Sequence, residues 1–486
     1  MAAATLSIVV TLMDGESLTL QLKAESAVKE LRTEVQRRLG PCHLIKGGQV
    51  LDQEHASLEA VGLKDGDELS AVKRQLAAAA NRHGFALLKD SYVLSPSRLP
   101  HDRSRQLEVR CDDVLALQSC WYAFAAIRND GSVSIWGPDC VCQVDTRGGH
   151  SMLQKVKSIQ TCEDLIAAIR EDGSVVTWPT LTTTVPVQGL ADWWTGRMQN
   201  LSVEHLENVR CIQSTSGAFA ALREDGSVVT MGKGPGGDSS SVQSSLQDVH
   251  CIQATSAAFA AIRTDGSVVT WGSSAHGGDS SKVREQLRRV RCIQASERAF
   301  AAILEDGKVV TWGCHEHGGD SRSVSRELRN VKGIQASRAA FAALLEDGSV
   351  VTWGKRDSGG DSSSVRGRLK DVRCIQATVK AFAAICHDGS VVSWGAGAGG
   401  DSSKVQKQLQ DVHAIQGAKA GEGAFAALLQ CGSVVTWGDA KLKEKLHDVV
   451  GIQANHTYFV AVRMDGSMAA WSCAPQRRKR PSLDPC

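Results

Sequence analysis

The sequence has little net charge and no long apolar segment. Its 486 residues carry 55 Lys and Arg against 53 Asp and Glu, a formal charge of +2. The charge therefore indicates neither the strong positive electrostatic field typical of a nucleic-acid-binding protein nor a dominant acidic tail. No run of 18 apolar residues occurs, which excludes an ordinary transmembrane helix. Residues 1–12 lack the basic start and cleavage site of a secretory signal, so we expect a globular protein with a large core.

The sequence also lacks a recognisable catalytic or cofactor-binding set. No nucleophile–base pair, phosphate loop or strong metal-ligand spacing stands out from it. Cys140, Cys142 and His150 would make a poor tetrahedral zinc set, because no second pair of ligands follows them. We therefore predict that the protein is not an enzyme and that it needs no cofactor or metal.

Repetition is what the sequence has in abundance. Segment 290–319 recurs, slightly altered, along most of the chain. The glycine of an Asp-Gly pair returns in steps of 40, 41, 41 and 41 residues from Gly226 to Gly389. A fixed period near 40 residues indicates a repeat architecture. Less regular copies place this glycine at Gly131, Gly173, Gly432 and Gly466, and residues 84–90 form a degenerate further copy, which makes nine or ten.

Each copy is expected to form three short strands. Residues 292–295 and 300–303 are apolar runs of strand length, and residues 309–312 are β-branched and aromatic. Asp306-Gly307 predicts a two-residue hairpin turn between the second and third strands. The second strand is apolar on both faces and must be covered on both sides. A radial stack of small sheets, a β-propeller, meets that demand.

A fourth segment leads from each copy to the next. In residues 279–290, Val283, Leu287 and Val290 have the spacing of one helix face, with Asp279 or Ser280 as the cap. This pattern predicts a short amphipathic helix or helical turn lying across each sheet.

The repeated unit resembles a known family. The order Phe300-Ala301-Ala302-Ile303, Asp306-Gly307, Val309, Trp312-Gly313 and then Gly318-Gly319 is similar to the regulator-of-chromosome-condensation repeat. The resemblance covers about residues 78–472 and implies a β-propeller over residues 76–473. That family forms seven-bladed rings, and the short copies here look more like the three-stranded blades of a bacterial β-lactamase-inhibiting propeller. Nine or ten copies exceed seven, so the ring is larger than usual, or open, or some end copies are not blades.

Tryptophan and cysteine recur at fixed places in the copies. We expect the tryptophans at Trp271, Trp312 and their equivalents to fill the space between sheets. The alternative, an excitonic cluster like that of a plant photoreceptor propeller, lacks the Gly-Trp-Arg-His-Thr repeats of that protein. Equivalent cysteines such as Cys251 and Cys292 would lie too far apart to bridge. The chain has fifteen cysteines, an odd number, and these features indicate reduced, buried thiols in a cytosolic or nuclear protein.

Residues 1–75 follow a different pattern. Two strands near residues 6–12 and 17–22, a helix with Val28, Leu31, Val35 and Leu39 on one face, and strands near residues 43–45 and 67–72 are expected. This ββαββ order resembles ubiquitin and implies a ubiquitin-like β-grasp domain. The apolar patch through which ubiquitin binds partners corresponds to Met13, Ile45 and Val72.

A partner-binding patch is one of two interpretations of those three residues; the other is that they have no function. Single exposed apolar side chains are ordinary on a small domain and need no function. The C-terminal Gly-Gly of ubiquitin is missing here, because Val72 is followed by Lys-Arg-Gln and then by the repeats. The domain can therefore dock to ubiquitin-binding domains or proteasomal receptors but cannot be conjugated.

The loops of the repeats are the predicted contact surface for another protein. In an antiparallel arrangement the loop after the first strand shares a face with the loop after the third strand. The copies agree in strands and turns but differ in these two loops, which is typical of a binding surface, although unconstrained drift would look the same. The candidates are Glu297, Arg298, His315, His317, Lys355 and Arg356. His315 and His317 could ligate a metal, but we expect them in solvent.

These features favour a mainly β, non-catalytic scaffold that links a propeller-bound partner to ubiquitin-related machinery. A guanine-nucleotide exchange factor for a small GTPase and a substrate-recognition subunit of a ubiquitin ligase are the alternatives. No membrane contact is expected, and a nucleic-acid partner is disfavoured. Residues 474–486 form a basic tail with the cations Arg477, Arg478, Lys479 and Arg480. Three interpretations are open: a nuclear import signal, a patch for an acidic partner, or a solvated tail without a function.

Overall fold

The structure is a computed structural model that describes part of the chain. The described residues are 5–12, 17–28, 30–31, 34–35, 42–46, 49–51, 56–73, 76–80, 85–89, 92–95, 107–110, 114–119, 124–128, 131–136, 144–145, 154–161, 165–179, 206–232, 234–418, 422–440, 442, 444–454, 458–463 and 468–473. The fold is mainly β, as predicted. No helix among these residues is long and apolar enough to cross a membrane.

The N-terminal segment forms one mixed five-stranded sheet. Its strands are β1 (Thr5–Leu12), β2 (Ser17–Lys23), β3 (Cys42–Lys46), β4 (Gln49–Val50) and β5 (Glu68–Lys73). The strand order is β2-β1-β5-β3-β4, with β1 and β5 parallel in the middle. Strand β4 was not among the four predicted strands, because two residues between turns give no periodic signal.

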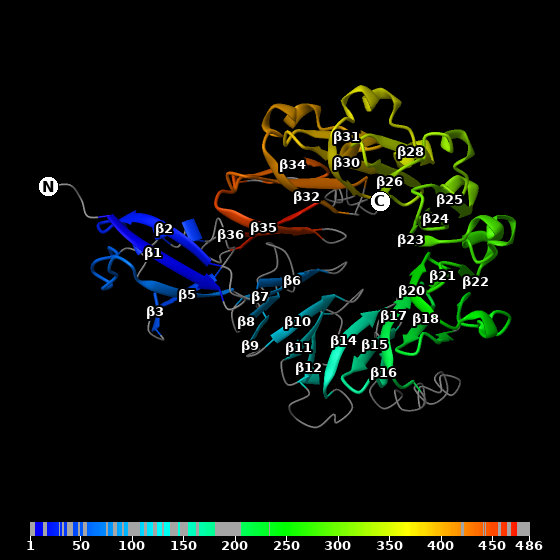
Figure 1. Cartoon of the computed structure of the whole chain (residues 1–486), viewed down its shortest axis with the longest axis horizontal. Helices are drawn as coiled ribbons and strands as arrows, with labels where there is room; N and C mark the ends of the chain where they lie inside the picture. The colour runs from blue at the N-terminus through cyan, green and yellow to red at the C-terminus, as the bar shows by residue number, and fades with distance from the viewer. Residues whose placement is uncertain are drawn as a thin grey trace, which may run out of the picture.

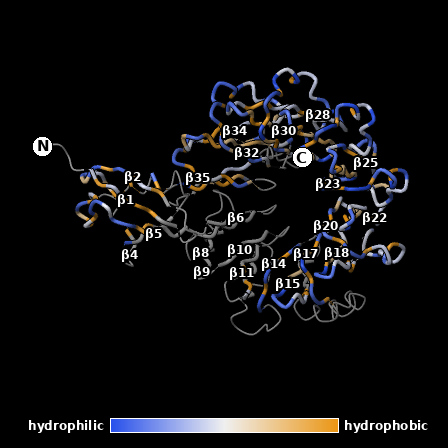
Figure 2. Tube along the Cα trace, viewed as in Figure 1, coloured by the Kyte–Doolittle hydropathy of each residue, from blue (hydrophilic) through white to orange (hydrophobic). Residues whose placement is uncertain are grey.

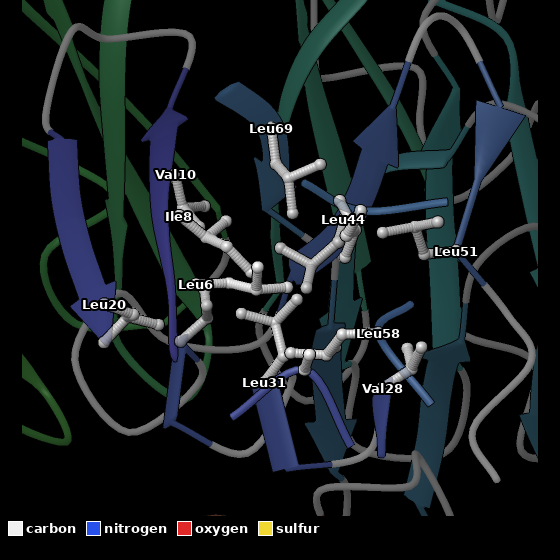
Figure 3. Close-up of a cluster of buried hydrophobic side chains, with 13 residues drawn as sticks. Leu6, Ile8, Val10, Leu20, Val28, Leu31, Leu44, Leu51, Leu58 and Leu69 are labelled. Atoms are coloured by element: carbon white, nitrogen blue, oxygen red, sulfur yellow. The ribbon is translucent and has the colours of Figure 1, made fainter. Parts of the chain in front are cut away.

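A separate hydrophobic core lies under this sheet. Val28, Leu31 and Val35 are helical and fully buried, as their spacing predicts, while Leu39 lies outside the described residues. They meet buried side chains of β1, β3 and β5 such as Ile8, which point toward one another in Figure 3. All thirteen buried residues of this cluster come from positions 6–69. The segment therefore packs its apolar side chains among themselves.

The repeats form a series of small antiparallel sheets, each built from consecutive strands. Two sheets have four strands and eight have three. The four-stranded sheets contain β6 (Leu76–Ala80), β7 (Phe85–Lys89), β8 (Tyr92–Ser95) and β9 (Leu107–Arg110), then β10 (Val114–Ser119), β11 (Phe124–Arg128), β12 (Val133–Trp136) and β13 (Val144–Asp145).

The three-stranded sheets match the predicted unit to within one or two residues at each strand end. Their strands are β14 (Val156–Thr161), β15 (Leu165–Arg170), β16 (Val175–Pro179); β17 (Val209–Ser214), β18 (Ala218–Arg223), β19 (Val228–Gly232); β20 (Val249–Ala254), β21 (Ala258–Arg263), β22 (Val268–Gly272); β23 (Val290–Ala295), β24 (Ala299–Leu304), β25 (Val309–Gly313); β26 (Val331–Ala336), β27 (Ala340–Leu345), β28 (Val350–Gly354); β29 (Val372–Ala377), β30 (Ala381–Cys386), β31 (Val391–Gly395); β32 (Val412–Ala418), β33 (Ala424–Leu429), β34 (Val434–Gly438); β35 (Val449–Ala454), β36 (Tyr458–Arg463) and β37 (Met468–Ser472).

The sheets follow one another around a ring (Figure 1). The first strands of neighbouring sheets contact each other, and β35 of the last sheet lies against β6 of the first. Apolar residues run along the strands, whereas hydrophilic residues dominate the turns and linkers at the outer edge (Figure 2). The middle strands, such as β24, are buried along almost their whole length. This confirms coverage on both faces for the middle strands from β18 to β33, whose burial the structure describes in full.

Five of the seams between sheets repeat one interaction. Trp312 is 4% exposed, stacks on Phe300 at 5.2 Å, and donates its indole N–H to the carbonyl of Gly277 in the preceding linker at 3.0 Å. Gly277 has a φ of 91°, and a Cβ there would lie 2.7 Å from the Phe300 ring. The first glycine of the Gly-Gly pair is thus required by close packing. The same contact joins Trp271, Trp353, Trp394 and Trp437 to Gly236, Gly318, Gly359 and Gly399.

The Asp-Gly turn is longer than predicted. Between β24 and β25, the N–H of Leu304 donates to the carbonyl of Lys308, and the N–H of Gly307 donates to the carbonyl of Leu304. Three residues therefore form the loop, and only Gly307 has a positive φ, 75°. This is a type I turn followed by a left-handed glycine, whereas a two-residue type I′ turn would need two positive φ values. The prediction of a two-residue turn was wrong, although it identified the glycine that the turn requires.

The linker was predicted as a short amphipathic helix or helical turn, and it forms a 3₁₀ helix, which confirms the helical turn. Segment η7 spans Ser281–Gln286, with Leu287 and Val290 buried beyond it and Val283 half-buried. Of the two predicted caps, only Asp279 satisfies a backbone donor at the start of the segment. Ser280 makes no side-chain cap hydrogen bond, and the Asp279 carboxylate accepts a hydrogen bond from the N–H of Ser281 at 2.9 Å. Six residues are too few for a stable α-helix, so the tighter 3₁₀ turn is found.

Candidate functional site

The loops after the first and third strands lie on one face of the ring, which we call the loop face. In the sheet β23–β25, the N–H of Cys314 donates to the carbonyl of Arg298 at 3.0 Å, so the two loops touch. Backbone hydrogen bonds also join the first loops of successive sheets. The N–H of Ser256 donates to Glu297, that of Glu297 to Arg338, and that of Arg338 to Val379, at 3.0 to 3.1 Å. The backbone of this face is therefore held in place from sheet to sheet.

Three of the loop-face side chains form a charged cluster at the seam between sheets β23–β25 and β26–β28. The Glu297 carboxylate accepts hydrogen bonds from Arg338 Nε at 2.6 Å and Arg338 Nη2 at 3.2 Å. His317 Nε2 lies 3.6 Å from Glu297 Oε2, the same oxygen that accepts the hydrogen bond from Arg338 Nε. The Arg338 hydrogen bond is the main cause that lowers the pKa of Glu297, so this carboxylate stays ionised at neutral pH.

His317 is not in solvent, contrary to the prediction. Its side chain is only 16% exposed, because it lies beside Glu297 under the first loop. Burial lowers the pKa of His317, and the positive charge of Arg298 lowers it further, against the opposing effect of Glu297. The imidazole is therefore neutral at neutral pH and can accept a proton.

The other loop-face residues lie at the surface as predicted. His315 has a side chain that is 79% exposed, 3.5 Å from Asp320 Oδ2. Lys355 shares with His315 a cavity of about 450 Å³ that Gly354 also lines. Arg356 is 84% exposed and lies 3.3 Å from Asp361. Arg298 is also exposed, so the face presents cations that are free to meet a partner.

The arrangement does not form a metal site. No group of three or more His, Cys, Asp and Glu side chains within the described ranges could hold a metal ion. The two histidines of segment 315–317 point to different partners, Asp320 and Glu297, rather than to a common centre. Cys140 and His150 lie outside the described residues, and so does the basic run 477–480.

Arg338 was missed in the sequence. It lies 41 residues after Glu297, at the same place in the next copy. Opposite charges at equivalent loop positions of adjacent copies would have indicated an ion pair across the seam. The repeat period alone could therefore have found this residue.

The proposed docking patch of the N-terminal sheet is described only by its backbone. Ile45 pairs with Ser70, and Val72 pairs with His43, in antiparallel register between β3 and β5. Leu44 and Leu69 are buried, so residues 45 and 72 alternate onto the opposite face of this strand pair. Met13 lies outside the described residues.

Comparison with known proteins gives distant structural likenesses. No protein-family model matches the sequence, and no curated protein matches it. The CRINKLY WD40 ectodomain of the Arabidopsis thaliana receptor kinase ACR4 is 13% identical over 66% of this chain and 94% of that chain, with a TM-score of 0.30. Yeast RCC1 (Prp20), solved bound to Kap60, is 14% identical over 50% of this chain and 70% of that chain, with a TM-score of 0.32.

A third likeness concerns the N-terminal segment. The C-terminal ubiquitin-like domain of human 2'-5'-oligoadenylate synthetase-like protein is 24% identical over 15% of this chain and 90% of that domain, with a TM-score of 0.14. Likenesses of this extent carry no information on function.

Proposed function

We propose that the protein is a non-catalytic interaction scaffold whose loop face holds another protein. The proposal rests on a difference between the residues that join the sheets and the residues that are exposed on the loop face. The contacts that join the sheets, such as Trp312 to Gly277, use residues that recur in the copies. The loop face is held by backbone hydrogen bonds, so its side chains are free to differ, and Lys355 and Arg356 are exposed there. A rigid frame with variable side chains on one face is suited to protein recognition.

The repeats are proposed to form a closed ring of ten blades of the regulator-of-chromosome-condensation type. The contact of β35 with β6 supports closure, because it brings the last sheet against the first. In such a ring the loop face would extend over several blades and would be wider than the loops of one blade.

Residues 1–75 are proposed to be a ubiquitin-like docking domain. The strand order β2-β1-β5-β3-β4 and the separate core support this assignment. We expect micromolar binding to ubiquitin-binding domains or proteasomal receptors, because a small apolar patch relies on a few anchors. Such a domain would link the propeller-bound partner to ubiquitin-related machinery in the cytoplasm, with the basic run 477–480 available for nuclear import.

Isothermal titration of the full chain with a ubiquitin-binding helix tests the docking domain. Ile45→Ala should abolish binding, whereas Thr19→Ala, an exposed residue of β2, should leave it unchanged. Equal binding by both variants would show that the domain does not use this patch.

Site-specific photo-crosslinking tests the scaffold itself. A photoreactive residue at position 315 on the loop face should crosslink the partner in cell extract. The same residue at position 308, beside the Asp-Gly turn on the opposite face, which we call the turn face, should not. Crosslinks from position 308 alone would place the partner on the wrong face and reject the proposal.

A separate assay addresses the exchange-factor alternative. Catalytic amounts of the chain should not accelerate release of labelled nucleotide from a panel of small GTPases. Accelerated release would favour that alternative over the scaffold. If the crosslinked partner is instead a substrate that becomes ubiquitinated only in the presence of this chain, the ligase-subunit alternative is favoured.

A further inference from the structure

Cys314 and His317 are brought together by the turn that follows β25. Cys314 precedes the 3₁₀ helix η8 (His315–His317), and the N–H of His317 donates to the Cys314 carbonyl at 3.0 Å. This tight turn places Cys314 Sγ 3.3 Å from His317 Nδ1, within hydrogen-bond distance for sulfur. Both side chains are half-buried. The sequence places the thiol and the imidazole three residues apart, but only the turn makes them neighbours.

The second nitrogen of the same imidazole faces a carboxylate. His317 Nε2 lies 3.6 Å from Glu297 Oε2, and Arg338 holds Glu297 by two hydrogen bonds. The thiol, the imidazole and the carboxylate therefore stand in line, in the order in which a nucleophile, its base and the group that orients the base are found in catalytic triads. The 3.6 Å separation is looser than a hydrogen bond, as is common before a substrate binds.

The neighbouring sheets show that the repeat fold supplies the geometry and that the residues supply the chemistry. In the preceding linker, Ser273 Oγ lies 2.9 Å from His276 Nδ1 in the same kind of turn. There the residue equivalent to Glu297 is Ser256, which has no carboxylate. In the following linker the equivalent pair is Lys355 and Ser358.

Three cations act on the imidazole. Arg298, Arg338 and Lys355 each lower the pKa of His317, so its ring nitrogen is free to accept the thiol proton. Reactive cysteines are found in such electropositive and partly exposed places.

We propose that Cys314 is a nucleophilic thiol that accepts an acyl group from an activated ester or thioester, with His317 as its base and Glu297 as the residue that positions His317. The sulfur forms a bond to the acyl carbon while its proton moves to His317 Nδ1. The bond from the acyl carbon to the leaving oxygen or sulfur breaks, and the leaving group takes the proton from His317. The product is an acyl thioester on the loop face, with no change in oxidation state. Such a modification would alter the surface that the scaffold presents.

The test uses the full chain and two probes, p-nitrophenyl acetate and an acetyl thioester. Acetylation at each cysteine is followed by peptide mapping in a mass spectrometer. Cys431 is a stringent internal control, because it is exposed and hydrogen bonds with Ser433 lower the pKa of its thiol, but no histidine among the described residues acts on it as a base. Cys314 should acetylate at least about tenfold faster than Cys431 at neutral pH if a base assists it. If Cys314 reacts with just one of the two probes, that probe identifies the acyl source, ester or thioester, that the site accepts. Faster reaction at Cys314 with either probe supports the proposal.

Variants separate the roles of the three residues. In His317→Ala the rate at Cys314 should fall roughly 100-fold, while the rate at Cys431 stays the same. His276→Ala, at the equivalent place in the preceding sheet, should leave Cys314 unchanged. Glu297→Gln should give a smaller loss and steepen the dependence of the Cys314 rate on pH, because a misplaced imidazole no longer takes the proton.

Two results would overturn the proposal. One is a Cys314 rate equal to that of Cys431 with both probes. The other is a Cys314 rate that His317→Ala does not change, in a variant whose melting temperature matches that of the parent chain.

Discussion

The middle seams and the last seam of the ring are built alike except for one hydrogen bond. In the middle seams the indole N–H donates to a glycine carbonyl at 3.0 to 3.1 Å, as with Trp353 and Gly318. In the last seam Trp471 is 6% exposed and stacks on Phe459 at 5.4 Å. Its indole N–H, however, has no hydrogen-bond partner among the described residues. The last seam is therefore closely packed, but its indole N–H makes no hydrogen bond with the described residues.

The linker explains this difference. Between Gly432 and Gly466 the repeat step is 34 residues, and Asp439-Ala440 follows Gly438 where the regular copies continue to a Gly-Gly pair. Without that pair, none of the described residues of this linker offers a carbonyl to the indole. Stacking therefore closes a seam without the glycine, and the hydrogen bond is a separate contribution that the middle of the ring has and the end lacks.

The largest expected effect is the loss of a whole seam tryptophan. Trp312→Ala should lower the free energy of unfolding by roughly 3–5 kcal/mol, the cost of deleting a buried large aromatic side chain. Trp471→Ala should cost less, since no indole hydrogen bond is lost with it. Denaturant titration of both variants measures the difference, and equal losses would show that the hydrogen bond adds nothing.

The next effect concerns the glycine on the other side of the seam. Gly318 has a φ of 89°, and a Cβ there would lie 2.6 Å from Phe341 Cδ2. Gly318→Ala should cost roughly 2–4 kcal/mol, combining left-handed strain with overpacking. Gly367→Ala is the control, because nothing lies within 4 Å of its added Cβ. If the two variants melt at the same temperature, the seam does not need glycine.

A smaller effect isolates the hydrogen bond itself. Trp353→Phe keeps a stacked ring but leaves the buried Gly318 carbonyl without its donor, which should cost about 1–3 kcal/mol. Trp471→Phe removes an N–H that already lacks a partner, so its cost should stay below that of Trp353→Phe. A larger loss in Trp471→Phe would mean that the last seam has a partner for its indole after all.

The smallest effect is a pH dependence on the loop face. Folding lowers the pKa of His317, mainly through burial. As the pH falls below about 6.5, the ordinary value, the unfolded chain takes up a proton more readily than the folded chain, so stability decreases. In His317→Gln this part of the loss between pH 7.5 and pH 5.5 should disappear. Parallel stability profiles for the two chains would show that His317 is not desolvated.

The sequence was sufficient for features that follow from periodicity. The three strands of the regular copies and the burial of Trp312 were predicted because they depend on recurring apolar runs and a fixed spacing, whereas the fourth strands β9 and β13 of the first two sheets were not predicted. The turn at Gly307 was predicted too short, since two-residue and three-residue turns both use a left-handed glycine. The apolar residues in and after segment 281–286 have a spacing that suits both an α-helix and a 3₁₀ helix, so the sequence did not distinguish the two.

The loop face was only partly predictable. His315, Lys355 and Arg356 lie at the surface as expected, but His317 does not, because its burial depends on the first loop folding over it. The pairing of Glu297 with Arg338 crosses a seam and needs the repeat register. The line from Cys314 through His317 to Glu297 needs the turn geometry itself, which no spacing encodes.

The central claim is that the regular seams hold the ring while the loop face carries the function. The most direct test is capture of the partner with two double variants of the full chain. Lys355→Glu with Arg356→Glu reverses charge on the loop face, and Lys308→Glu with Lys332→Glu reverses it at the turn end; all four residues are exposed. The account predicts that the first variant loses the partner, the second retains it, and both melt like the parent chain. Retention by the loop-face variant together with loss by the turn-face variant would contradict it.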